Sequence, residues 1–531
     1  TTGSANVGVG QGCLPNPDTE SNNIAIGMDT MSGSIAGGEF NVAIGNNTLD
    51  ALTSGDFNTV VGYNAGTDMT TGNSNNLIGY LAGENIVDGA HNTFIGRQAG
   101  RGTTSASAQI FIGGSAGESN TTGGGNTASG YRALIYNSTG KFNTAFGGCA
   151  LFCNTTSECN TGVGYNALRD STTGSQNVAV GWAALQTNTT AHYNTAIGTG
   201  AMHLNTTGCH NVGSGFKALF SNTTASYNTA VGSCALGANT TGAGNTAVGQ
   251  FSLKTNTTGA SNAGLGANTL QANTTGGSNI AIGDCALLNN TTASHNIGIG
   301  HGALCDATTG DSNTAVGGVA MENTTTGDFN IAMGKYALNG NTTGCRNTGL
   351  GYAALIYNTT GILNTAVGAC ALYNNTTGRN TAIGFMSMTA NTTGTRNTAS
   401  GIYSLCKNTS GCNNTASGYM ALLKNTTGTM NTASGSYSMT DNTTGSYQAA
   451  FGSCSLHANT TGIRNTALGH APLRANTTGR DNVGVGFAAL LVNSTGCRNT
   501  ASGSYAMYST TSGKYNTASG YKSLLSATTA S

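Results

Sequence analysis

Residues 228–244 read NTAVGSCALGANTTGAG, and residues 245–261 repeat the pattern as NTAVGQFSLKTNTTGAS. Each stretch opens with an Asn that is followed by Gly four residues later, and this pair recurs about every 17 residues. We number coil positions from this anchor Asn, which is position 1. The series runs from Asn6 to Asn516 and comprises 31 coils. A short period sustained along a whole chain predicts a solenoid, in which each coil contacts only its neighbours.

The 17-residue coil predicts strands and turns rather than helices. Positions 2 to 4 alternate between polar or β-branched and small residues, which is typical of a short strand. Gly at position 5 allows a turn with positive φ, and the Asn-Thr-Thr-Gly at positions 12 to 15 supplies a second turn. Position 9 is Leu or Met in every coil from Leu134 to Leu524, and positions 8 and 9 are expected to form a second strand. We therefore predict an all-β fold, a β-solenoid (β-roll) of about 31 stacked 17-residue coils.

Stacking places like positions one rung apart, at roughly 4.8 Å, so that 31 rungs extend on the order of 150 Å. We expect a core made of the position-9 leucines and the Val and Ile of position 4. The alanines of position 3 would then form a smooth outer ribbon. Position 6 is often aromatic and predicts an exterior or interface stripe, with a binding platform as the alternative. The anchor asparagines are expected to stack into a structural amide ladder, for example Asn143, Asn160, Asn177 and Asn194.

The chain is predicted to be one continuous array over residues 1–531, with less regular coils in 1–125 and regular coils in 126–531. Only 7% of the residues are charged, and the 19 basic residues equal the 19 acidic ones. This balance argues against a nucleic-acid partner. No apolar run reaches 18 residues, which argues against membrane insertion. We find no catalytic constellation and no cofactor or metal motif, so we expect a protein that is not an enzyme.

The unit Asn-Ile-Ala-Ile-Gly at 23–27 and 279–283 resembles the head repeats of trimeric autotransporter adhesins. The longer pattern N-T-A-x-G-x-x-A-L-x-x-N-T-T-G resembles repeats of phage and large-virus tail-fibre or surface-fibre proteins. These resemblances imply a left-handed β-roll in the structural shaft of an extracellular or virion fibre. They also imply self-association as a homotrimer. Because no capping domain is visible at either end of the array, an end-to-end polymer is the other expected form of self-association. A resemblance to plant ice-binding β-rolls keeps open a surface-binding alternative, in which the chain engages a glycan, a cell-surface receptor or ice.

A glycosylation sequon occupies position 12 in twenty coils. In a secreted product these asparagines would carry a row of glycans. The alternative is a second internal Asn ladder, which excludes a glycan at the same residue. The candidate glycosylation sites include Asn137, Asn154, Asn188, Asn205, Asn222, Asn239, Asn256 and Asn273.

The cysteines fall into two columns. Cys149, Cys234, Cys285, Cys370 and Cys454 share position 7, and Cys209, Cys345, Cys412 and Cys497 share position 16. Neither column has cysteines in successive coils, and four position-7 cysteines are followed by a position-16 cysteine two or three coils later, which exceeds the reach of a disulfide. We therefore expect disulfides between neighbouring chains in an oxidising compartment, with buried free thiols as the alternative. His203, His210 and Cys209 share a coil and are a weak candidate for metal binding, with ordinary turn residues as the alternative.

Overall fold

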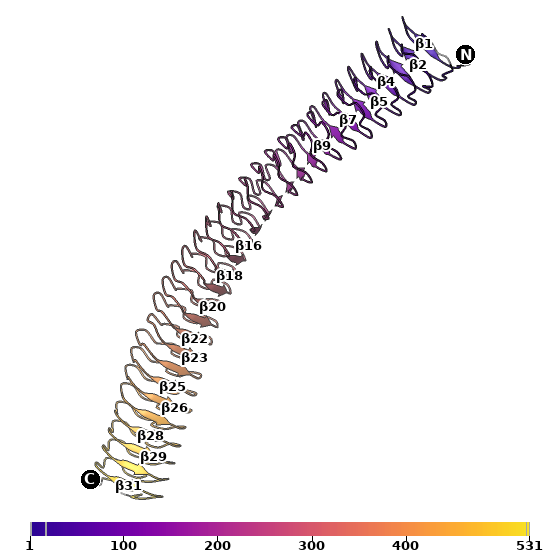
Figure 1. The fold of residues 1–531 in the computed structure, drawn as a ribbon. Helices are drawn as coiled ribbons and strands as arrows, with labels where there is room; N and C mark the ends of the chain where they lie inside the picture. The colour runs from indigo at the N-terminus through magenta and orange to yellow at the C-terminus, as the bar shows by residue number, and fades with distance from the viewer. Residues whose placement is uncertain (1–2, 16–18, 527, 530–531) are drawn as a thin grey trace. The chain divides into compact units, whose positions relative to one another are not determined.

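The computed structural model describes residues 3–15, 19–526 and 528–529. The chain divides into two compact units, Thr1–Gly264 and Leu265–Ser531. The described part contains strands and turns but no helix, and each strand belongs to one coil (Figure 1). The prediction of an all-β solenoid with a 17-residue repeat is therefore confirmed.

Every strand has three residues, which occupy coil positions 2 to 4. In the first unit the strands are β1 Val7–Val9, β2 Ile24–Ile26, β3 Val42–Ile44, β4 Thr59–Val61, β5 Asn76–Ile78, β6 Thr93–Ile95, β7 Ile110–Ile112, β8 Thr127–Ser129, β9 Thr144–Phe146, β10 Thr161–Val163, β11 Val178–Val180, β12 Thr195–Ile197, β13 Val212–Ser214, β14 Thr229–Val231 and β15 Thr246–Val248. Strand β16, Ala263–Leu265, contains the residues at which the units divide.

In the second unit the strands are β17 Ile280–Ile282, β18 Ile297–Ile299, β19 Thr314–Val316, β20 Ile331–Met333, β21 Thr348–Leu350, β22 Thr365–Val367, β23 Thr381–Ile383, β24 Thr398–Ser400, β25 Thr415–Ser417, β26 Thr432–Ser434, β27 Ala449–Phe451, β28 Thr466–Leu468, β29 Val483–Val485, β30 Thr500–Ser502 and β31 Thr517–Ser519. Within each unit successive strands pair in parallel and in register. For example, Thr229 pairs with Thr246 and Val231 with Val248.

Gly at position 5 closes the strand because no other residue fits there. Gly147 has a φ of +129°, and a Cβ on it would lie 2.7 Å from the carbonyl carbon of Gly164 in the next coil. Both the conformation and the close approach of the neighbouring backbone require a residue without a side chain. This explains why the repeat keeps this glycine in each coil.

The expected second strand at positions 8 and 9 is wrong, because these residues form turns. The amide of Ala150 donates to the carbonyl of Gly147 at 3.3 Å, and that of Asn154 donates to the carbonyl of Leu151 at 3.2 Å. Leu151 has a φ of +52°, in the left-handed region. That conformation costs an L-residue about 1–2 kcal/mol. Burial of the leucine side chain, about 1.5–3 kcal/mol, offsets the cost.

The expected orientation of the strand is also wrong, because position 3 faces the core and position 4 faces outward. Ala145 is fully buried, whereas Phe146 is 57% exposed. The reason is the narrow interior. The position-9 Leu reaches the strand from the opposite wall and leaves room there for Ala or Gly only. The larger residues of position 4 must therefore lie outside.

Four of the less regular coils build the same core from the opposite wall. Phe94 and Phe111 occupy position 3, and Gly100 and Gly117 occupy position 9. The two phenylalanine rings are buried and stack with their centroids 5.0 Å apart. A Cβ on Gly100 would lie 2.5 Å from the ring of Phe94. One large side chain per coil therefore fills the interior, either from the strand or from the turn.

The anchor asparagines form a buried ladder between coils. The backbone amide of Asn160 donates to Oδ1 of Asn143 at 3.0 Å, and the amide of Asn177 donates to Oδ1 of Asn160 at 2.9 Å. Asn194 continues the series at 3.0 Å. The Nδ2 atom of Asn143 donates to the carbonyl of Ser157 at position 15 of its own coil, at 2.8 Å. Each anchor side chain therefore joins both its own turn and the next coil.

Candidate interaction surface

The outer face of the sheet consists of the side chains at positions 2 and 4. Ile26 is 38% exposed and Val231 is 39% exposed, although both are apolar. Across the 31 described strands, none of these outward residues is charged, whereas the chain contains 38 charged residues, 19 basic and 19 acidic. Proteins commonly place charged side chains where a sheet would otherwise associate, for example on edge strands. This face carries no charge and combines apolar side chains with threonine and serine, a composition that is suited to a contact surface.

Aromatic residues follow both margins of this face. At position 17, immediately before the anchor, His210 stacks between Tyr193 and Tyr227 with centroid distances of 4.8 and 5.1 Å. At position 6, Tyr63 stacks on Tyr80 at 5.8 Å. These rings are largely exposed, as the sequence predicts for position 6. The position-17 row was not predicted, because its residues are too varied to stand out from the repeat.

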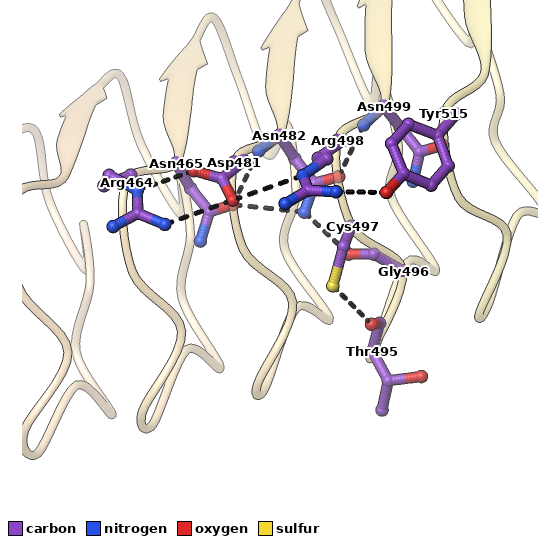
Figure 2. Close-up of polar contacts among 10 residues, drawn as sticks. All are labelled: Arg464, Asn465, Asp481, Asn482, Thr495, Gly496, Cys497, Arg498, Asn499 and Tyr515. Carbon is purple, nitrogen blue, oxygen red and sulfur yellow. Dashed lines mark hydrogen bonds and ion pairs between the residues drawn. The ribbon is translucent and has the colours of Figure 1, made fainter.

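Part of the position-17 row is charged instead of aromatic (Figure 2). Arg464 Nε donates to Asp481 Oδ1 at 2.6 Å, and Arg498 lies 4.0 Å from the other carboxylate oxygen. Arg498 also donates to the hydroxyl of Tyr515 and lies over its ring. The hydrogen bond from Arg464 lowers the pKa of Asp481. Opposite charges in successive coils therefore pair along the stack.

The sequon asparagines of position 12 lie inside the coils. Asn222 Nδ2 donates to Asn205 Oδ1 at 2.7 Å, and Asn239 Nδ2 donates to Asn222 Oδ1 at 2.9 Å. The structure therefore contains the second Asn ladder, and a glycan on any of these amides would require that residue to leave it. The eight candidate sites are all fully buried: Asn137, Asn154, Asn188, Asn205, Asn222, Asn239, Asn256 and Asn273.

All 14 cysteines are free thiols in this single chain. The position-16 cysteines belong to a further ladder between coils. The backbone amide of His192 approaches Cys209 Sγ at 3.4 Å, and that of Asp328 approaches Cys345 Sγ at 3.3 Å. In other coils the acceptor at position 16 is oxygen, such as Ser226 Oγ, at 3.0 Å from the amide of Cys209. Cysteine thus replaces Ser or Asp there, a role that the spacing of the cysteines did not reveal. The thiols of Cys412 and Cys497 donate to the position-14 carbonyl of their own coils, at 3.3 Å each.

Two of the position-7 cysteines, Cys149 and Cys234, line shallow cavities that are formed mainly by positions 7, 10 and 11. One cavity in the first unit is lined by Cys234 together with Lys217, Phe220 and Lys254. Another is lined by Cys149. In the second unit a similar cavity contains Cys406. All five position-7 cysteines are half-buried, namely Cys149, Cys234, Cys285, Cys370 and Cys454.

Burial weakens the acidity of several thiols at positions 7, 10 and 11. It raises the pKa of Cys305, at position 10, to about 12, with the neighbouring Asp306 carboxylate adding to the effect. Burial also raises the pKa of Cys153, Cys285 and Cys406. A protonated thiol is a poor nucleophile. The Cys305 thiol is therefore a weaker nucleophile at neutral pH than an ordinary thiol.

The described residues contain no group of three or more His, Cys, Asp or Glu side chains that could hold a metal ion. His203 stacks on Phe220 at 5.1 Å, and His210 stacks between two tyrosines. Among the same residues, no helix is long and apolar enough to cross a bilayer. No protein-family model matches the chain, and no curated protein matches its sequence.

Proposed function

We propose that the chain is the structural shaft of an extracellular or virion fibre and has no enzymatic activity. The observation that carries the proposal is the uniform stacking of the coils. Strands, turns and four columns of polar side chains each hydrogen-bond from one coil to the next. The fourth column is at position 13, where Thr155 Oγ1 donates to the carbonyl of Thr172 at 3.1 Å. Such a stack is a quasi-one-dimensional array in which each coil is held by its two neighbours, as a fibre shaft requires.

In this proposal the chain self-associates, as a homotrimer or an end-to-end polymer. Disulfides between neighbouring chains, through the cysteines of positions 7 and 16, would strengthen the assembly. Peptide mapping of the native material would detect them, and finding only free thiols would exclude them. The same mapping would show whether any sequon carries a glycan.

Mass per unit length of the native assembly, measured by scanning transmission electron microscopy, tests the proposal. One chain per cross-section gives one coil, a thirty-first of 52.9 kDa, for each rung of roughly 4.8 Å. A bundled shaft of three chains gives three times that value. If the native protein forms no filament at any concentration or salt condition, the fibre proposal is wrong.

A second candidate is binding to a periodic or glycan-coated surface. It is favoured by Thr and Ser two residues apart on the outer face of three successive strands, β24 to β26. The paired hydroxyl groups recur in register from one strand to the next. Adsorption of the chain to ice, or selective binding to a glycan array, would support this candidate over a purely structural role.

A further inference from the structure

The charge-free outer face of the sheet is large enough for a stable protein contact. A three-residue strand spans about 10 Å, and the fifteen strands β1 to β15 of the first unit extend about 70 Å at roughly 4.8 Å per strand. The face of this unit therefore covers about 700 Å². Two such faces in contact would bury about 1,400 Å², within the range of standard interfaces, about 1,600 ± 400 Å².

The repeat of the face restricts what can cover it. The outward side chains recur every coil, at roughly 4.8 Å, on both units. A partner that matches this spacing over many coils must itself present side chains at the same interval. A second copy of this chain does so, because its own outer face has the same rung spacing. Its face also lacks charge, so neither partner would bury an unpaired charge, which is costly.

We propose that two copies of this chain associate laterally through the outer faces formed by positions 2 and 4. This inference rests on the proposed function, since it names the surface through which chains of the fibre meet. The two sheets would pack at about 10 Å, as in other face-to-face sheet pairs. Exposed apolar residues such as Ile282, Ile331 and Phe451 would interdigitate between them. The aromatic rows at positions 17 and 6 would border the contact.

Lysine substitutions on this face test the proposal in the full chain. Lysine is tolerated on an exposed strand, but facing rows of lysine would repel and would be desolvated. The face variant carries Val231→Lys, Val248→Lys, Ile282→Lys and Ile331→Lys. The control variant carries the same number of lysines at exposed position-14 residues of the same coils, Thr241→Lys, Thr258→Lys, Thr292→Lys and Thr343→Lys.

Analytical ultracentrifugation of the three proteins, with circular dichroism to verify the fold, gives the result. We expect the wild type and the control to sediment at two or more times 52.9 kDa, and the face variant to fall to the mass of one chain. A face variant that keeps the assembled mass would overturn the inference, even if filaments form. A wild type that is a single chain would also overturn it. The fibre proposal would survive that second outcome if electron microscopy shows filaments with one chain per cross-section.

Discussion

The packing of Phe94 against Gly100 provides a direct test of the core. Phe94→Ala empties the interior of its coil and is expected to cost about 3–5 kcal/mol. Gly100→Leu alone places a side chain against the Phe94 ring, where a Cβ would lie at 2.5 Å, and should cost about 1–3 kcal/mol. The double variant recreates the Ala and Leu pair that Ala128 and Leu134 form two coils later. It should cost only about 1–2 kcal/mol, the strain of leucine in the left-handed region.

The two substitutions should therefore couple favourably by at least about 2 kcal/mol. Hydrogen exchange of the amides in strands β5 to β8 is the suitable assay, because a repeat array opens locally and a global transition averages over the coils. Phe146→Ala is the matched control. This phenylalanine lies on the outer face, and its loss should change stability by less than about 0.5 kcal/mol. Costs of the single variants that simply add in the double variant would refute the shared-interior reasoning.

Three further results follow from the polar groups. Asn222→Ala breaks a buried ladder on both sides and should cost about 1–3 kcal/mol in local hydrogen exchange, whereas Thr224→Ala, on the exposed turn, should have almost no effect. Burial raises the pKa of Asp50 in the folded chain, so the ionised carboxylate destabilises the fold above that pKa. Asp50→Asn should therefore raise the melting temperature at pH 7, but not below the unfolded pKa of about 4. An unchanged melting temperature at pH 7 would contradict this. Cys305, whose pKa is about 12, should be alkylated at pH 8 about 100-fold more slowly than the exposed Cys159, and the two rates should converge in denaturant.

Much of the fold follows from the period of the sequence. The spacing of anchor Asn and Gly predicts the coil, and the Leu column predicts one wall of the core. The direction of the strand could not be obtained in this way. Alternation shows that Ala145 and Phe146 face opposite ways but does not show which one is inside. Hydrophobicity alone favours Phe146 in the core. However, Leu151 already fills the interior, so only the small Ala145 fits there.

Two other features, the turn at position 9 and the role of the position-16 cysteines, could not be predicted because general residue preferences favour other interpretations. Leucine rarely adopts a positive φ, so the sequence predicts a strand at Leu151, where the structure has a turn. The thiol of Cys209 resembles a disulfide partner more than a hydrogen-bond acceptor, so its place in the position-16 ladder was missed. In both cases the contacts that stabilise the unusual arrangement come from the neighbouring coil, so the sequence of one coil does not predict it.

The residue type at one coil position depends on the residues at the same position in the neighbouring coils. Position 12 is Leu52, Met69 and Ile86 in three successive coils, and it is Asn in most coils from Asn120 onward. A single Asn at position 12 between apolar neighbours would lose its hydrogen-bond partners in the coils above and below. A single Leu between asparagines would leave the side-chain amides of both neighbours unpaired. Each unpaired buried polar group costs about 1–3 kcal/mol. The change from one kind of interior to the other is therefore expected in blocks. At the boundary lies Thr103, a small side chain with a polar hydroxyl group and an apolar methyl group.

The outer face lacks this restraint, since position 4 varies freely between Ser, Val and Phe. The absence of charge on this face is what the proposed lateral contact between two chains requires.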